Sequence, residues 1–500
     1  MSSETHESPG AEERAAGPRR TSRGVLVTVV LQWCRYLTTV VALILLARLL
    51  TPRDYGLVAE AAAITGLAAV VGDLGLSLAA LQAPSLTQRQ KTGLFWVNAA
   101  VGVLVAGIVA ALAHPLAAFY GEPRVVEVTL GLSLVFAING FAVQLKVEIN
   151  RALRFTALGV TDLASQAVAL GSAVAAALLG AGFWALVIQQ LAYATVGLLL
   201  AAALAGWRPS APWRSGGIGD LLRFGRDTFA VQVANYITST VDAVVIGRLF
   251  GAAVLGLYNR AFQLVLLPLN QVLSPLTRVF LPRLAAVADD REFNDVLVRL
   301  QRVVAYVIAG PLSLAACIAT PLLSVVLGPR WAAAGSLMQL LLVGAVFQAL
   351  GYLYYWAFLA RRSTRDLFVS ELWGRVPMVV LFVTLGRLGP EFVALSVAIG
   401  QALIWAAGTF RYGARAGVRT AQVLAVCRRP LVVWVLAAIC GKTVDALVPD
   451  ALPAIVRLGV LALAWVVVPG AAYASTRVIR DDVGAVVREV LPARLRPRAA

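Results

Sequence analysis

Apolar runs of about 20 residues recur along the chain from Val25 to Ser475, and short polar segments separate them. A run of this length crosses the hydrocarbon core of a bilayer as an α-helix. The runs are continuous rather than alternating, which favours helices over a β-barrel. The pattern predicts an all-α polytopic membrane protein with about fourteen spans, near residues 25–49, 55–80, 93–113, 125–146, 157–180, 183–206, 219–247, 254–281, 302–327, 332–357, 366–386, 390–410, 430–447 and 453–475.

One helical hairpin occurs twice in the sequence, because residues 31–61 align without a gap with residues 231–261. Polar and glycine positions carry the match: Gln32, Tyr36, Thr38, Arg48 and Gly56 recur as Gln232, Tyr236, Thr238, Arg248 and Gly256. A long internal repeat determines the architecture of a chain. The number of predicted spans between the copies is even, so both copies run the same way through the membrane. We therefore predict two pseudo-symmetric six-helix lobes.

The repeat and the polar segments together define the expected domains. The expected parts are a disordered cytoplasmic tail (1–24), an N-terminal six-helix lobe (25–206), a cytoplasmic linker (207–218), a C-terminal six-helix lobe (219–412), two additional helices (428–475) and a cytoplasmic C-terminal tail (476–500). Leu284–Gln301 alternates apolar and charged residues, which predicts an amphipathic helix on the inner membrane surface.

Composition and charge support a membrane protein and give its orientation. The chain is 60% hydrophobic and 14% charged, whereas soluble domains are about a quarter charged. Its net charge of +17 lies in short loops, which is typical of topology signals and not of a nucleic-acid-binding face. With the N-terminus inside, cytoplasmic segments hold 31 Lys and Arg and outer segments hold 8. We expect a multi-pass protein of the cytoplasmic (inner) membrane with both termini in the cytoplasm.

Cysteine and histidine usage gives no sign of a metal or cofactor site. The four cysteines lack metal-ligand spacing, and the sequence contains only two histidines. We expect no cofactor. The predicted outer loops are short, which argues against a membrane glycosyltransferase or polymerase with a large catalytic outer loop.

Four segments give the chain a family resemblance. They are LARLLTPRDYGLVA (46–59), GDLGLSLAALQ (72–82), LFWVNAAVG (94–102) and FGRDTFAVQVANYITSTVDAVVIGRLFGAAVLGLYNRA (224–261). Over residues 25–412 the chain resembles Wzx/WzxC-type flippases of polysaccharide and lipopolysaccharide biosynthesis, in the multidrug/oligosaccharidyl-lipid/polysaccharide exporter superfamily. The resemblance implies two lobes in a V around a central cavity. It also implies translocation of undecaprenyl-pyrophosphate-linked oligosaccharide to the outer leaflet by alternating access, without covalent catalysis.

Other functions remain open at this point. Within the superfamily, the alternatives are a lipid II flippase and a drug/cation antiporter; outside it, a membrane glycosyltransferase or polymerase is less favoured. The expected partners are a lipid-linked oligosaccharide, membrane lipids and a coupling cation or proton. We expect a monomer and no nucleic acid.

Arginines within predicted spans are the candidates for substrate binding, because a charge there costs about 2.5–3.5 kcal/mol on insertion scales. Arg35 and Arg375 lie deep in their spans, and Arg260 lies in the outer third of its span. Arginine binds phosphates in bidentate fashion. Polar side chains occur at similar depth: Gln32, Tyr36, Gln189, Gln190, Gln232, Asn235, Asn270, Gln271, Gln348 and Gln401. These would suit a sugar-bearing pyrophosphate, although each amide could instead join two helices.

Differences between the two repeats indicate coupling and gating residues. Ala42 aligns with Asp242, and Glu60 aligns with Arg260. Asp242 would bind a cation or proton, a role that the superfamily resemblance favours in the second lobe; the alternative is a structural ion pair with Arg260. Glu60 and Arg260 have opposite charges at equivalent positions, so they could close the outer mouth of the cavity as an ion pair.

The loop-charge bias predicts the topology directly. Cysteines introduced at Ser215 and Ser363 should be shielded from an impermeant thiol reagent in intact cells, whereas one at Ala118 should be labelled. The unmodified chain with its four native cysteines is the control. Labelling of the Ser215→Cys chain from outside would contradict the lobe assignment.

Overall fold

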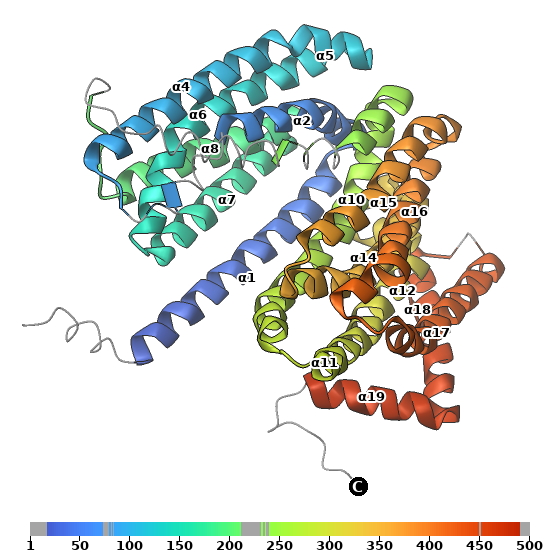
Figure 1. The fold of residues 1–500 in the computed structure, drawn as a ribbon. Helices are drawn as coiled ribbons and strands as arrows, with labels where there is room; N and C mark the ends of the chain where they lie inside the picture. The colour runs from blue at the N-terminus through green and yellow to red at the C-terminus, as the bar shows by residue number, and fades with distance from the viewer. Residues whose placement is uncertain are drawn as a thin grey trace, which may run out of the picture. The chain divides into compact units, whose positions relative to one another are not determined.

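The computed structural model describes residues 18–73, 80–81, 83, 85–211, 232–233, 236, 240–449 and 452–490. Every regular element among these residues is a helix (Figure 1). The chain divides into two compact units, Met1–Ile237 and Thr238–Ala500. The predicted boundary was the linker 207–218, of which residues 212–218 lie outside the described residues.

Twelve helices of the described residues are long and apolar enough to cross a membrane. This supports the predicted all-α multi-pass membrane protein, but not the count of fourteen. Predicted span 55–80 corresponds to helix α2 (Pro52–Asp73), which is not among the twelve. Predicted span 219–247 lies mostly outside the described residues.

Unit 1 is a bundle of long helices joined by short connections. Its helices are α1 (Pro18–Leu49), α2 (Pro52–Asp73), α4 (Gln88–Ala111), α5 (Ala113–Tyr120), α6 (Val125–Arg151), α7 (Phe155–Leu178) and α8 (Trp184–Leu204). Helix α4 packs along α6, α7 packs along α8, and α1 packs along α7. Helix α6 also contacts α8, so α1, α6, α7 and α8 form a continuous packed group.

Glycines allow α4 and α6 to approach closely. A Cβ atom on Gly102 of α4 would lie 2.8 Å from the Cα atom of Gly140 and 2.8 Å from the carbonyl oxygen of Phe136. In lipid, helices associate through such close packing of small residues, because lipid tails remove the hydrophobic driving force. The Gly102–Gly140 crossing therefore contributes to the stability of unit 1.

The first copy of the repeat consists of two helices joined by a short turn, and the two helices pack on different neighbours, α1 on α7 and α2 on α6. Helix α1 ends at Leu49, and α2 begins at Pro52. Thr51 caps α2 together with Asp54: the Thr51 hydroxyl donates to the Asp54 carboxylate at 2.7 Å, and the Asp54 backbone N–H lies 3.3 Å from that hydroxyl. These contacts satisfy donors at the helix N-terminus.

The second copy breaks at the equivalent position. Helix α10 (Val241–Ala286) is interrupted at Gly251, which has φ 77° and ψ 177°. Gly251 aligns with Thr51 in the repeat. A positive φ favours glycine, since it has no Cβ atom to clash with the backbone. The two copies thus turn at the same place by different means, a side-chain cap in one and a glycine in the other.

Unit 2 contains α10 and a larger set of helices. They are α11 (Asp290–Val303), α12 (Ala309–Cys317), α13 (Ala319–Val326), α14 (Ala334–Ala360), α15 (Thr364–Thr384), α16 (Pro390–Ala406), α17 (Thr420–Leu447), α18 (Ala454–Ser475) and α19 (Arg477–Val490). Segments 304–308 and 407–412 are π-helical, and segments 329–331, 386–388 and 413–416 are 3₁₀-helical. Helix α14 packs against α10 and α16, and α15 packs against α16.

The two additional helices, α17 and α18, are held to α12 through tryptophans. The Trp434 and Trp465 rings stack at 5.3 Å with an interplanar angle of 7°. The Trp434 indole N–H donates at 2.8 Å to the carbonyl of Ala305, inside the π-helical segment 304–308. The Trp465 indole N–H donates at 3.1 Å to the Ser313 hydroxyl of α12. The pair is therefore an integral part of unit 2.

Two amphipathic helices pack together in unit 2. The predicted helix at 284–301 corresponds to α11, which begins at Asp290 after an Asp289 cap. Part of the predicted C-terminal tail forms α19, which contacts α11 and α18. The Asp482 carboxylate of α19 is largely buried and lies 3.4 Å from both Arg302 and Arg429. These charges fix α19 to α11 and α17.

We expect Gly140→Val to destabilise the protein by about 1–3 kcal/mol, because the added side chain would force α4 and α6 apart. Thermal unfolding in detergent would report this as a lower melting temperature. Gly107→Val on α4 is the matched control, since nothing lies within 4 Å of a Cβ atom built there. Equal melting temperatures for the two variants would contradict the close-packing role of Gly140.

Candidate functional site

A polar cavity of about 470 Å³ lies within unit 1. Helices α1, α6, α7 and α8 each contribute to its wall. The polar side chains that line it are Arg35, Thr39, Asn139, Gln166, Gln189, Gln190 and Tyr193. Six of these seven, all except Arg35, carry amide or hydroxyl groups that both donate and accept hydrogen bonds. The predicted residues Arg35, Gln189 and Gln190 therefore share one cavity.

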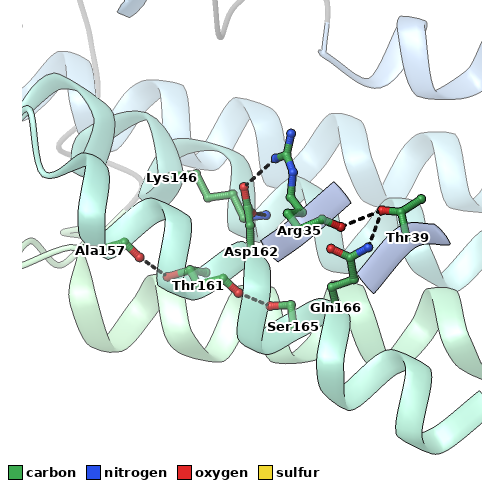
Figure 2. Close-up of polar contacts among 8 residues, drawn as sticks. All are labelled: Arg35, Thr39, Lys146, Ala157, Thr161, Asp162, Ser165 and Gln166. Carbon is green, nitrogen blue, oxygen red and sulfur yellow. Dashed lines mark hydrogen bonds and ion pairs between the residues drawn. The ribbon is translucent and has the colours of Figure 1, made fainter. Parts of the chain in front are cut away.

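Arg35 lies at the charged part of this cavity. Its Nη1 atom lies 3.5 Å from the Asp162 carboxylate of α7, and its side chain is 56% exposed (Figure 2). The same carboxylate lies 3.7 Å from the Lys146 ammonium of α6. The Lys146 ammonium in turn lies 5.6 Å from the centre of the Tyr193 ring. One carboxylate thus bridges two cations that come from different helices.

A neutral hydrogen-bond chain continues from Arg35 along the cavity wall. The Gln166 amide donates at 2.6 Å to the Thr39 hydroxyl, which donates at 3.0 Å to the backbone carbonyl of Arg35. Figure 2 shows Asp162 and Gln166 on α7 beside Arg35 and Thr39 on α1. Their spacing of four residues places each pair on one face of its helix. These contacts orient the side of α1 that carries Arg35.

A second, smaller cavity of about 180 Å³ lies within unit 2. Its polar lining consists of Asp242, Arg375, Gln348 and Gln401. Arg375 also pairs with Glu371, four residues earlier on α15, at 2.7 Å. The structure thus brings together Asp242 and Arg375, which the sequence did not place near one another.

Asp242 is buried beside a tyrosine rather than an arginine. Its Oδ2 atom accepts a hydrogen bond from the Tyr258 hydroxyl at 2.5 Å, and its Oδ1 atom accepts from the backbone N–H of Ala243 at 2.8 Å. The Arg260 guanidinium instead donates to the Gln263 side chain at 2.9 Å. Among the described residues, the alternative ion pair between Asp242 and Arg260 is therefore not formed.

Glu60 is fully buried in α2, and neither carboxylate oxygen has a hydrogen-bond partner among the described residues. Nearby at the start of α2, Arg53 pairs with Glu122 at 2.6 Å. The Glu122 carboxylate, through its hydrogen bond and its charge, raises the pKa of Arg53. The gating ion pair of Glu60 with Arg260 stays a prediction.

The remaining predicted residues lie outside these cavities or outside the described residues. Gln32 is exposed on α1, and Tyr36 is half-buried, with its ring 5.9 Å from that of Trp33. Gln232 is partly exposed. Asn235 lies outside the described residues. Neither Gln32 nor Tyr36 lines the unit 1 cavity, although helical spacing places both on the side of α1 that carries Arg35 and Thr39.

Two charged residues beside the unit 1 cavity, Lys146 and Asp162, were not among the predicted site residues. Lys146 is the last residue of predicted span 125–146, and Asp162 lies within predicted span 157–180. A signal was present, because a carboxylate inside a span requires a partner. Asn139, Gln166 and Tyr193 gave no comparable signal, since uncharged polar residues are common in such helices.

This arrangement is suited to ligand binding. Arginine and lysine bind phosphate oxygens, and the amides and hydroxyls around them bind the hydroxyls of sugars. The described residues hold no group of three or more histidines, cysteines or carboxylates that could bind a metal ion. The unit 1 cavity therefore fits a ligand with an anionic group and a polar, uncharged group.

Comparison with known proteins gives one family and several relatives. The family model described as "Polysaccharide biosynthesis protein" matches residues 45–336. The chain is 26% identical over 333 residues to the teichuronic acid biosynthesis protein TuaB of Bacillus subtilis, covering 65% of this chain and 68% of TuaB. It is 28% identical over 299 residues to the succinoglycan biosynthesis transport protein ExoT of Rhizobium meliloti, covering 59% and 60%. With the lipopolysaccharide biosynthesis protein WzxC of Escherichia coli it shares 25% over 318 residues, covering 62% and 64%.

Solved structures share the fold at low sequence identity. The lipid II flippase MurJ in an inward closed conformation aligns with a TM-score of 0.67 and 11% identity, covering 92% of this chain and all of that chain. An inward-facing multidrug resistance transporter of the MATE family, in the MOP superfamily, aligns with a TM-score of 0.56 and 16% identity, covering 78% and 98%. At these identities the likeness shows the fold.

Proposed function

Because the chain belongs to the polysaccharide biosynthesis protein family, we propose that it is a flippase for a lipid-linked oligosaccharide. Its substrate is an oligosaccharide on undecaprenyl pyrophosphate, which it moves across the cytoplasmic membrane for the synthesis of a cell-surface polysaccharide. The names of the relatives TuaB, ExoT and WzxC, which refer to biosynthesis or transport of such polymers, support this substrate class.

The unit 1 cavity is the observation that carries the proposal. It combines the cation of Arg35 with the amides of Asn139, Gln166, Gln189 and Gln190. A pyrophosphate needs cations, and an oligosaccharide needs many hydrogen-bonding groups that carry no charge. Both kinds of group line the same space, on four different helices of one bundle.

Transport proceeds by alternating access in this proposal, with no covalent step. The fold shared with solved MurJ and MATE structures supports such a mechanism. The excess of Lys and Arg in alternate loops supports a cytoplasmic location of both termini and the inner membrane as the site of action.

Lipid II flipping and drug/cation antiport are the alternatives that the shared fold leaves open. The cation in the unit 1 cavity favours an anionic substrate over cationic drugs. A lipid II flippase also needs a pyrophosphate site, so the family match and the named relatives favour a surface polysaccharide precursor.

Coupling to an ion gradient is assigned to Asp242 in this proposal. Its carboxylate is buried and lines the unit 2 cavity together with Arg375, Gln348 and Gln401. A buried carboxylate favours binding of a proton or a cation over remaining ionised alone. In the first copy of the repeat, Ala42 occupies the equivalent position, so only unit 2 would carry this function.

Loss of an arginine charge should strongly reduce export. At normal protein levels, Arg35→Ala and Arg260→Ala should each reduce flipping by about 10- to 100-fold, since a hydrogen bond to a charged group contributes about 1.5–3 kcal/mol. Surface polysaccharide should disappear and its lipid-linked precursor should accumulate inside. Arg35→Lys should restore little activity, because lysine lacks the bidentate guanidinium.

The matched control for these variants is Arg415→Ala. The Arg415 side chain is 57% exposed and pairs with Asp366 at 3.0 Å outside both cavities, so it resembles Arg35 in exposure and pairing. Normal export by the Arg35→Ala protein would contradict the pyrophosphate site in the unit 1 cavity, and normal export by the Arg260→Ala protein would exclude Arg260 from substrate binding.

Asp242→Asn should separate binding from coupling. The variant keeps the size of the side chain and its contact with Tyr258 but cannot titrate. It should bind lipid-linked substrate normally and lose gradient-dependent flipping in proteoliposomes. Tyr258→Phe is the control, since it removes the 2.5 Å hydrogen bond and leaves the carboxylate. If Asp242→Asn proteoliposomes still respond to the gradient, Asp242 is not the coupling residue.

A further inference from the structure

We propose that Asp162 is an internal anion that holds Arg35 of the unit 1 cavity and the neighbouring Lys146 in the absence of substrate, and that the substrate's pyrophosphate displaces it. This inference rests on the proposed function and adds two residues to it, Asp162 as a displaceable counter-ion and Lys146 as a second phosphate-binding cation.

The first support is that one carboxylate serves two cations from different helices. Asp162 lies on α7, Arg35 on α1 and Lys146 on α6, with separations of 3.5 Å and 3.7 Å. The two cations therefore converge on a single anion position. A phosphate group that replaced the carboxylate there would be in reach of both (Figure 2).

The second support is that both contacts are loose. Charge-assisted hydrogen bonds usually have lengths of about 2.7–2.9 Å, and both separations at Asp162 are longer. The side chains of Arg35, Lys146 and Asp162 are 56%, 28% and 20% exposed, so water weakens their attraction. Such pairs can be exchanged for shorter bonds to phosphate oxygens at small cost.

The third support is the balance of charge. In a lipid-linked oligosaccharide the pyrophosphate is esterified at both ends, so each of its two phosphates carries one negative charge. Arg35 and Lys146 together match that charge, but Asp162 cancels one of the two cations. When the Asp162 carboxylate moves away from Arg35 and Lys146, the charge of the site becomes complementary to that of the substrate. When substrate departs, the carboxylate returns and opposes rebinding.

Neighbouring contacts allow this exchange without disrupting the cavity. The Gln166–Thr39 hydrogen bond, at 2.6 Å, joins α7 to α1 one turn away from the Asp162–Arg35 pair. Lys146 also lies over the Tyr193 ring at 5.6 Å. Lys146 therefore keeps its contact with Tyr193, and the backbone of Arg35 keeps its hydrogen bond from Thr39, after the carboxylate has moved.

The test is binding and flipping by the full-length protein with Asp162→Asn. The probe is undecaprenyl pyrophosphate in nanodiscs, measured by native mass spectrometry, with uncharged undecaprenol as the comparison lipid. Removing a like charge near 4 Å should tighten binding of the pyrophosphate lipid at least about tenfold. Binding of undecaprenol should not change. Lys146→Gln should weaken binding of the pyrophosphate lipid.

Transport kinetics separate displacement from a purely structural role. In proteoliposomes Asp162→Asn should lower both KM and kcat, because substrate is held more tightly and released more slowly. A residue that only joined α1 to α7 would lower the melting temperature without tightening binding. Asp162→Glu keeps the charge and should not tighten binding; Asp162→Ser is a second charge-removing variant if Asp162→Asn does not fold.

Asp366→Asn is the matched control. Asp366 pairs with Arg415 in unit 2, and these side chains are 21% and 57% exposed, close to the values for Asp162 and Arg35. It should leave binding unchanged. Suppose that the unmodified protein prefers undecaprenyl pyrophosphate, but the folded Asp162→Asn protein binds this lipid no more tightly than the unmodified protein does. The proposed displacement of Asp162 is then wrong, and the proposed function stands. If the unmodified protein shows no preference for pyrophosphate over undecaprenol, the proposed function itself is wrong.

Discussion

Charged and polar groups inside a membrane must be satisfied by other parts of the protein, because hydrocarbon offers neither water nor counter-ions. In unit 1 this constraint brings together Arg35, Asp162 and Lys146 from three helices. In unit 2 it places Tyr258 on the Asp242 carboxylate. Because these side chains require partners, the charged groups gather in a few clusters. Arg35 and Asp242, one from each cluster, also line the two cavities.

Local features of the fold could be predicted from the sequence because they depend on short-range chemistry. The two helices of the first repeat are joined at a turn where Thr51, Pro52 and Asp54 form a helix cap. The break in the second copy falls at Gly251, the aligned position. The predicted count of fourteen spans is not confirmed, because twelve helices of the described residues qualify and predicted span 219–247 lies mostly outside those residues.

The candidate site could be predicted only in part, because the contacts between its residues are long-range. Arg35 stood out because a lone arginine within an apolar run has no explanation in its own helix. Its partner Asp162 is 127 positions away and meets it only through the packing of α1 against α7. The contact between Asp242 and Tyr258 depends on the turn at Gly251, which folds two parts of one element together. Spacing in a sequence does not reveal such contacts.

The π-helical segment 304–308 has a mechanical consequence for unit 2. A π-helical turn holds one residue more than the α-helical path, so it offsets the faces of the helices on either side by about 100°. Helices α11 and α12 both pack on α14 and α17, and in addition α11 contacts α19 whereas α12 contacts α18. The Trp434 indole N–H donates a hydrogen bond to the carbonyl of Ala305, which lies in this π-helical segment. Conversion of the segment to a regular α-helix would move the Ala305 carbonyl away from the Trp434 indole. The hydrogen bond from α17 therefore stabilises the π-helical conformation.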